Sequence, residues 1–379
     1  MEYKYNSPIA YMIFFIICLG FSVLINTIFI KFTKTLGIRK NTDQQTIRWE
    51  SKQKPAIGGI SIYIIFLLSL IAFEIIFKQG SELLNKQIIG FVGAVSLGFL
   101  MGLADDAYNT VPFLKLLTQI TCGLILAFTG TFINIFSLDI FNYILTVVWV
   151  VAVMNSINLI DNMDAVSSII SIFINIAAIS ILVISTNLNE IYFTMLIGVS
   201  AALIGFLYHN WHPSKIYMGD TGTQFLGVFL ATIGIACFWN FGDSEIIDGQ
   251  IKENSPSLLG ISKNLILIIL IFILPISDTA TVIVNRLMKG QSPMIGGKDH
   301  TTHHLHYLGL SEKHIAILFM VISFISIILI IIISKFITNW TWLYFSLFFT
   351  YFLIVGGGLY STTKLSKEPE TEKTIVNEN

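Results

Sequence analysis

Runs of apolar residues long enough to cross a lipid bilayer recur along almost the whole chain. A spanning helix needs about 20 consecutive apolar residues, and eleven segments reach or approach that length. They are residues 9–32, 57–77, 88–104, 113–133, 141–158, 165–185, 190–208, 223–241, 264–286, 314–334 and 340–361. We predict an all-α polytopic membrane protein with ten or eleven transmembrane helices. Residues 1–363 are expected to form a single integral-membrane domain, followed by a short charged tail over 364–379.

The composition narrows the class of protein further. Only 12% of the residues are charged, against roughly 25% in soluble domains. The formal net charge of −1 argues against a nucleic-acid partner. Cys18, Cys122 and Cys237 each lie inside an apolar run. They are expected to be buried hydrophobic residues rather than disulfide or zinc ligands.

Lysine and arginine are unequally divided between the two faces of the predicted membrane domain. With eleven spans, 16 of the 22 basic residues fall in segments on one side. The positive-inside rule makes that side cytoplasmic. We therefore expect the N-terminus outside, the C-terminus in the cytoplasm, and the acidic loop 242–263 outside. The chain is expected in the inner (cytoplasmic) membrane.

Two adjacent carboxylates, Asp105 and Asp106, end the third predicted span on the cytoplasmic side. Lys115 begins the fourth span, and Gln119 follows one turn later on the same helix face. Charged side chains at the bilayer centre cost roughly 2.5–3.5 kcal/mol on insertion scales. The carboxylates therefore indicate a cation, a proton or a phosphate nearby. The alternative is a solvated loop pair with a lysine that extends to the interface.

The fifth span ends with Asn155, Asn158 and Asp161, and Asp164 continues the spacing of three residues. Residues at this spacing share one face of a helix end. Their carboxamide and carboxylate oxygens are hard ligands suited to Mg²⁺ or Mn²⁺. Helix capping would explain one or two of these residues, but not four in register.

The seventh loop carries Asn210 and the turn Gly219-Asp220-Thr221-Gly222 into the eighth span. Backbone N–H groups at such a helix start suit an anion, and the carboxylate of Asp220 suits the counter-cation of that anion. An ordinary N-cap is the alternative.

The ninth loop is rich in basic groups and glycine. Arg286, Lys298, His300, His303 and His304 are expected to form a flexible cationic loop that closes over phosphates. A zinc site at the histidines is disfavoured because two of them are adjacent and no cysteine is near. A plain solvated loop remains an alternative.

All these polar clusters fall on the predicted cytoplasmic face, and the outer loops contain nothing comparable. Clustered carboxylates hold a divalent cation, and clustered cations hold phosphates. The residues therefore predict a metal-dependent phosphotransferase acting on a membrane lipid. The alternative is a membrane transporter with an intramembrane carboxylate site. Transporter charges usually lie near the midplane with repeat symmetry. Here only Asp278 is that deep, and no repeat is visible.

Four segments resemble a known family: LADDAYNTVPFLKLLTQ, NSINLIDNMD, HNWHPSKIYMGDTG and DHTTHHL. They are similar to the polyprenyl-phosphate N-acetylhexosamine-1-phosphate transferases, and nearer to the WecA/TagO branch than to MraY. The resemblance spans about residues 34–310. It implies that a UDP-N-acetylhexosamine, with N-acetylglucosamine the favoured sugar, donates its sugar phosphate to undecaprenyl phosphate and releases UMP. This would be the first membrane step of a surface glycan such as O-antigen or a teichoic-acid linkage unit. The resemblance also implies Mg²⁺, with Mn²⁺ as an alternative, and a homodimer.

The resemblance assigns roles to individual residues. The expected catalytic residues are Asp105, Asp106, Lys115, Asp161 and Asp220. The expected metal ligands are Asp106, Asn158 and Asp220. The expected substrate-binding residues are Asn155, Asp164, Asn210, Arg286, Lys298, His300, His303 and His304. Two mechanisms remain open: direct attack by an acceptor that Asp105 deprotonates or positions, and a covalent intermediate on Asp161.

The chain departs from the family in the turn after Asp161. The usual Gly-x-Asp-Gly is Asn162-Met163-Asp164-Ala165 here. A left-handed backbone conformation costs alanine more than glycine, so the loss of both glycines leaves the local backbone conformation open.

Overall fold

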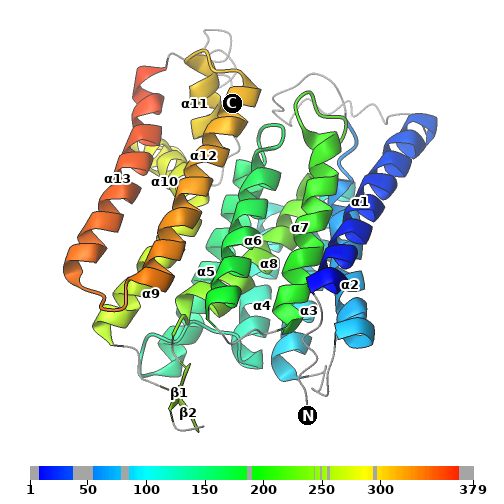
Figure 1. Cartoon of the computed structure of the whole chain (residues 1–379). Coiled ribbons are helices and arrows are strands. Elements are labelled where there is room, and N and C mark those ends of the chain that lie inside the picture. The colour runs from blue at the N-terminus through cyan, green and yellow to red at the C-terminus, as the bar shows by residue number, and fades with distance from the viewer. Residues whose placement is uncertain are drawn as a thin grey trace.

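The computed structural model describes residues 8–36, 54–77, 85–185, 190–242, 244–247, 250–253, 257–292 and 297–366. Helices dominate these ranges (Figure 1). Their bounds are α1 Pro8–Leu36, α2 Gly58–Ala72, α3 Lys86–Tyr108, α4 Pro112–Thr129, α5 Asp139–Ile160, α6 Val166–Ile184, α7 Glu190–Asn210, α8 Gly219–Gly234, α9 Leu258–Ile271, α10 Ile273–Met288, α11 Thr301–Tyr307, α12 Glu312–Ile331 and α13 Trp342–Leu365. Short π-helical segments η1 Phe73–Phe77, η2 Ile235–Trp239 and η3 Ile332–Phe336 extend α2, α8 and α12.

The described helices confirm the predicted polytopic membrane fold. Ten are long and apolar enough to span a membrane, or up to eleven if the bent pair α9 and α10 counts as one span. The span predicted over 264–286 is bent, because it covers parts of α9 and α10, which meet at an angle of 81°. Pro275 follows the break at Phe272, and proline cannot donate a backbone hydrogen bond to the preceding turn. The predicted tail lies largely outside the described residues.

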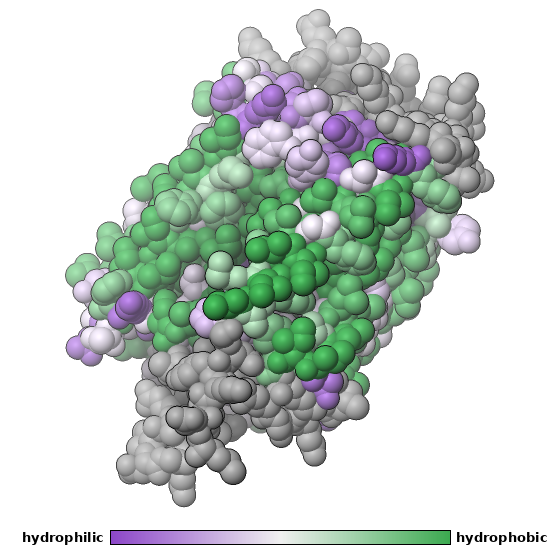
Figure 2. Space-filling view, turned by 45° about the vertical axis from the view of Figure 1, so that its right-hand side comes forward, coloured by the Kyte–Doolittle hydropathy of each residue, from purple (hydrophilic) through white to green (hydrophobic). Residues whose placement is uncertain are grey.

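A short hairpin and the helix α11 mark opposite ends of the bundle (Figure 1). The strands β1 Ser244–Ile247 and β2 Gln250–Glu253 pair antiparallel, with Ser244 opposite Glu253. They belong to the loop that the charge distribution assigns to the outside. Figure 2 shows a broad apolar belt, with hydrophilic residues gathered above it at the α11 end. This is the surface expected of a protein embedded in a bilayer.

The helix α8 is the buried centre of the bundle and packs against α2, α3 and α5. Of an 18-residue apolar stretch within the span Gly219–Trp239, which contains α8, 94% is buried inside the protein. Glycines allow the close approach of its neighbours. A Cβ atom on Gly227 would lie 2.6 Å from the Cα of Met154 on α5, and one on Gly102 of α3 would collide with the backbone oxygen of Asp220. The first turn of α8 is therefore pressed against the end of α3.

Candidate active site

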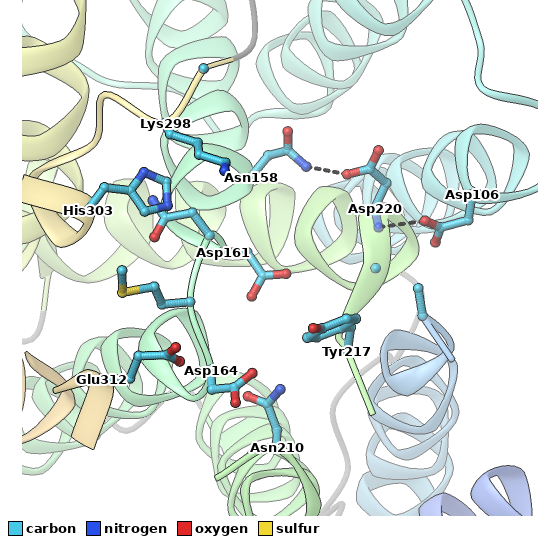
Figure 3. A pocket seen from close by; sticks show the side chains of 15 residues that line it. Asp106, Asn158, Asp161, Asp164, Asn210, Tyr217, Asp220, Lys298, His303 and Glu312 are labelled. Atoms are coloured by element: carbon cyan, nitrogen blue, oxygen red, sulfur yellow. Dashed lines mark hydrogen bonds between the residues drawn. The ribbon is translucent and has the colours of Figure 1, made fainter. Parts of the chain in front are cut away.

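A pocket opens among the helix ends on the α11 side of the bundle. Its volume is about 320 Å³, within the range of small-molecule sites. The end of α3, the turn between α5 and α6, the α7–α8 loop, the segment before α11 and the start of α12 all contribute to its walls (Figure 3). Eight of the predicted site residues line it: Asp106, Asn158, Asp161, Asp164, Asn210, Asp220, Lys298 and His303.

Asp106 holds the first turn of α8. Its Oδ1 accepts a hydrogen bond from the backbone N–H of Asp220 at 3.0 Å. Its Oδ2 accepts from the backbone N–H and the hydroxyl of Thr221 at 2.8 and 2.6 Å. The first N–H groups of a helix lack partners within the helix, and the N-cap residue Met218 supplies none from its side chain. Asp106 therefore caps α8 from α3 and fixes the position of Asp220.

Lys115 joins two carboxylates. Its Nζ lies 2.8 Å from Oδ2 of Asp105 and 3.1 Å from Oδ2 of Asp220. The other oxygen of Asp105 accepts hydrogen bonds from the backbone N–H and the hydroxyl of Thr110. Asp105 does not line the pocket. It anchors the lysine that steadies Asp220.

Asn158 holds Asp220 from the opposite side. Its amide nitrogen donates to Oδ1 of Asp220 and to the hydroxyl of Thr223, the latter at 2.8 Å. Lys115 and Asn158 thus hold one carboxylate oxygen each. A half-turn of the Asn158 amide would place its oxygen, instead of its nitrogen, beside Asp220.

Asp161 points into the middle of the pocket, between Asp220 and Asp164 (Figure 3). Burial and, to a smaller extent, three nearby carboxylates raise the pKa of Asp161 to about 7, although the hydroxyl of Ser167, which donates to it, opposes the rise. A carboxyl group in this setting shares its charge with a proton near neutral pH unless a cation is present.

The donor set fits a divalent cation. Asp161, Asp220 and Asn158 line the same pocket and bring carboxylate and carboxamide groups to its walls (Figure 3). Hard oxygen donors of this kind suit Mg²⁺ and Mn²⁺. Asp106 binds the start of α8 through both oxygens, and Asp220 contacts Lys115 and Asn158 through its two oxygens. Asp161 accepts from Ser167 through Oδ1 and points into the pocket, so it is the better candidate ligand than Asp106.

Asp164 and Asn210 bind the α5–α6 turn to the loop that precedes α8. Asp164 accepts hydrogen bonds from the backbone N–H and hydroxyl of Ser214 at 2.9 and 2.6 Å. Asn210 accepts from the backbone N–H of Ala165 at 3.0 Å and donates to the carbonyl of Ile216 at 3.0 Å. Both residues also line the pocket.

The two departures from glycine in this turn have different outcomes. Ala165 adopts the left-handed conformation, with φ of 70° and ψ of −17°. Asn162 does not, since Asn109 and Ala165 are the only described residues other than glycine with positive φ. The open question about the backbone is thus answered, because only Ala165 needs the conformation that glycine favours.

The segment expected to be a flexible cationic loop is in part an anchored helix. Residues Thr301–Tyr307 form α11, so the expectation of a flexible loop is wrong there. Asp278 of α10 caps it, accepting from the backbone N–H and hydroxyl of Thr301 at 2.8 and 2.7 Å and lying 2.9 Å from Nδ1 of His300. Arg286 makes two hydrogen bonds of 2.7 Å to Asp299 just before it.

His303 and Lys298 form the wall of the pocket nearest α11 (Figure 3). Burial and, to a smaller extent, the neighbouring His300 lower the pKa of His303 to about 3. His303 is therefore neutral at physiological pH, contrary to the cationic role expected for it. The positive charge on this wall comes from Lys298.

Six predicted residues lie behind the pocket walls: Asp105, Lys115, Asn155, Arg286, His300 and His304. Asn155 exchanges hydrogen bonds with Gln119, and Gln119 also donates to Gln224. His304 lies 2.6 Å from the hydroxyl of Ser366. These residues fix helices against one another rather than facing the pocket.

The pocket also includes residues that the sequence did not single out. Tyr217 contributes an aromatic ring, with the Nζ of Lys54 lying 5.0 Å from its centroid. Glu312 at the start of α12 lies 3.1 Å from Nδ1 of His212. Tyr217 falls inside a motif that was recognised, but Glu312 carried no signal except its place at a helix start.

Helix ends that bring carboxylates, amides and a lysine to one pocket at the membrane edge define an integral-membrane enzyme of the phosphotransferase type. Comparison with known proteins gives the family. Residues 88–238 match the model of glycosyl transferase family 4. The chain is 30% identical over 242 residues to a phospho-N-acetylmuramoyl-pentapeptide-transferase of Streptococcus uberis, covering 58% of this chain and 71% of the relative. The chain belongs to glycosyl transferase family 4.

Two further relatives match over longer stretches. A probable undecaprenyl-phosphate N-acetylglucosaminyl 1-phosphate transferase of Bacillus subtilis is 29% identical over 318 residues, which cover 80% of this chain and 78% of the relative. A decaprenyl-phosphate N-acetylglucosaminephosphotransferase of Mycolicibacterium smegmatis is 25% identical over 288 residues, covering 70% and 68%.

Proposed function

We propose that this protein transfers N-acetylglucosamine-1-phosphate from UDP-N-acetylglucosamine to undecaprenyl phosphate, giving undecaprenyl-diphosphate-N-acetylglucosamine and UMP. The observation that carries the proposal is the convergence of Asp161, Asp220 and Asn158 on one pocket that Lys298 also faces. The names of the Bacillus and Mycolicibacterium relatives, which contain a polyprenyl phosphate and N-acetylglucosamine, support the choice of acceptor and sugar.

A divalent cation completes the proposed site. Mg²⁺, with Mn²⁺ as the alternative, would be held by Asp161, Asp220 and Asn158, while Asp106 keeps Asp220 in place. When bound, the cation would neutralise negative charge on the donor pyrophosphate. Asp161 would then remain ionised at neutral pH, because a neighbouring positive charge lowers the pKa of a carboxyl group.

The acceptor needs orientation more than activation. An oxygen of the lipid phosphate forms a bond to the β-phosphorus of the donor, and the bond from that phosphorus to the bridging oxygen breaks, so that UMP leaves with the bridging oxygen. A phosphate monoester has its second pKa near 6, so the attacking oxygen is already ionised at neutral pH. Asp105 then serves to position Lys115, and Asp161 as a covalent nucleophile is the alternative.

The remaining walls suit the donor. The ring of Tyr217 offers a flat apolar face for the nucleobase, near Asp164 and Asn210 (Figure 3). Lys298 would meet phosphate charge, and neutral His303 would act through hydrogen bonding. We further propose that this end of the bundle faces the cytoplasm. The excess of basic residues on that side and the position of the hairpin at the other end support this orientation. A homodimer remains a prediction.

A transporter has no comparable support. The carboxylates of the pocket lie at helix ends, and Asp278, the one acidic residue expected to be deep in the membrane, accepts hydrogen bonds from the start of α11. Its burial is therefore explained by a structural partner.

The proposal is tested by UMP release from purified protein given UDP-N-acetylglucosamine, undecaprenyl phosphate and MgCl₂. Release should require both the lipid and the metal, and EDTA should abolish it. A panel of UDP-sugars then identifies the preferred donor. Failure to release UMP from any UDP-N-acetylhexosamine would overturn the proposal, and release in EDTA would overturn the role of the metal.

A further inference from the structure

The five-residue turn Asp161–Ala165 is the meeting point of the elements around the pocket. Asp161 contacts α6 through Ser167, Asp164 holds the α7–α8 loop, and the N–H of Ala165 binds α7. The remaining polar member is Asn162, which lines the pocket and stands where the family usually has glycine.

Asn162 links two elements that are far apart in the sequence. Its amide nitrogen donates to the carbonyl of Leu159 at 3.0 Å, which closes the end of α5. Its amide oxygen accepts a hydrogen bond from the hydroxyl of Thr302 on α11 at 2.6 Å. A glycine at this position would make neither contact, although the backbone conformation does not require one.

Thr302 directly precedes His303, the histidine that faces the pocket. Thr302 is fully buried, and His303 is 2% exposed. The helix α11 has only seven residues, so its position depends on contacts with its neighbours rather than on its own length. Asp278 fixes its first residue, and Ser366 contacts His304 on another side. The contact with Asn162 runs from α11 to the Asp161 turn.

We propose that Asn162 is a positioning residue, which through Thr302 holds His303 at the correct distance from the turn that carries Asp161. The inference rests on the proposed function, because it assigns His303 to the donor side of the same reaction. Asn162 itself need not touch the substrate. Its effect should therefore disappear when the imidazole of His303 is absent.

The test is a double-mutant cycle between Thr302 and His303. Thr302→Val keeps the shape of the side chain but removes the hydroxyl, and Thr302→Ser keeps the hydroxyl. Binding of UDP-N-acetylglucosamine is measured by calorimetry with Mg²⁺, and kcat and KM by UMP release. Thr302→Val and Asn162→Gly should each weaken donor binding about tenfold, while Thr302→Ser should stay within about twofold of the unsubstituted protein.

The second arm repeats Thr302→Val in a His303→Gln background, where it should cause no further loss of donor binding. Thr279→Val is the matched control, since it removes a hydroxyl contact of 2.9 Å to Ser156 between α10 and α5. It should leave donor binding unchanged.

An equal loss from Thr302→Val with and without His303 would overturn the inference, as would no loss at all in the unsubstituted background. A uniform fall in melting temperature with unchanged donor affinity would reduce the contact to a structural one and would also overturn it. Absence of both donor binding and UMP release in the unsubstituted protein would instead refute the proposed function, and the inference with it.

Discussion

The starts of α8 and α11 are built in the same way but give the pocket opposite properties. Each is capped by an aspartate from another helix, Asp106 on α3 for α8 and Asp278 on α10 for α11. At α8 the capped turn carries a second carboxylate, Asp220. At α11 it carries hydroxyl groups followed by neutral His303. The same kind of helix cap therefore places a negative charge on the α8 wall of the pocket and an uncharged imidazole ring on the α11 wall.

The difference indicates that the two walls have separate tasks. The α8 wall gathers carboxylates whose mutual repulsion a bound cation would relieve. The α11 wall has its buried carboxylate, Asp278, fully occupied by the helix that it caps. A cation is therefore expected at the start of α8 and not at the start of α11.

The largest expected effect comes from removing the charge at the start of α8. Asp220→Asn should lower the rate of UMP release by at least about a hundredfold, because preorganised charge at a reacting centre contributes on this scale. The protein should remain folded, since the new amide oxygen can still accept from Lys115 and its NH2 group can donate to Asn158 after a half-turn of the Asn158 amide. The matched control is Asp139→Asn at the opposite, exposed end of α5. Retained activity in Asp220→Asn would remove this residue from the metal site.

Removing the two caps should cost different amounts of stability. Asp278→Ala should lower the free energy of unfolding by about 3–5 kcal/mol, because it leaves buried partners without their acceptor. Asp106→Ala should cost only about 1–2 kcal/mol, the usual value of a lost helix cap, since its loss also relieves repulsion among the pocket carboxylates. Thermal unfolding in detergent measures both. Equal costs would show that the two caps stand in equivalent electrostatic surroundings.

Asp161 gives the α8 side a dependence on pH. With a pKa of about 7, above the ordinary value near 3.9, this group makes the metal-free protein lose stability as pH rises from about 4 through 7. Asp161→Asn should remove that part of the slope. As pH increases toward 7, the apparent affinity for Mg²⁺ should increase by up to about tenfold per pH unit, because the cation displaces one proton from the site. Above pH 7 the affinity should level off.

Metal titrations followed by thermal shift at pH 6, 7 and 8 measure this dependence. An Mg²⁺ affinity that stays flat across this range would exclude Asp161 as a ligand that titrates near neutrality. Tyr217→Phe serves as a control, since it changes the same pocket without changing a carboxylate.

The smallest effect is expected in the turn between the two walls. Ala165→Gly should raise the free energy of unfolding by about 0.5–1 kcal/mol, because relief of the left-handed conformation exceeds the added freedom of the unfolded chain. The same change at Ala178, within the regular helix α6, should destabilise by about 1 kcal/mol. A loss of stability in Ala165→Gly would mean that the methyl group packs more favourably than its backbone conformation costs.

The sequence predicted the spans well because a length of about 20 apolar residues is a local property. It missed the bend between α9 and α10, although Pro275 was a visible signal. Within the site it found Asp161 and Asp220, whose positions at helix ends follow from the chain itself. The cap formed by Asp106 was not visible, because it depends on how closely α3 approaches α8.

Asn155 shows why shared periodicity was not enough. It lies on the same helix face as Asn158, but three residues of helix correspond to about 4.5 Å along the axis. That displacement places it among Gln119 and Gln224 rather than in the pocket. Glu312 illustrates the opposite case. Its partner His212 lies 100 residues earlier in the chain, so only the packing of α12 brings the two together.

The close packing at Gly102 extends the reach of the site beyond the residues that face it. A single methyl group there would displace the backbone oxygen of Asp220, although residue 102 adds no atom to the pocket. In a genetic screen, substitution of Gly102 by alanine should therefore give the same loss of activity as inactivating substitutions of Asp220. A map of the positions where substitution abolishes activity would then include the contact between α3 and α8 as well as the catalytic residues.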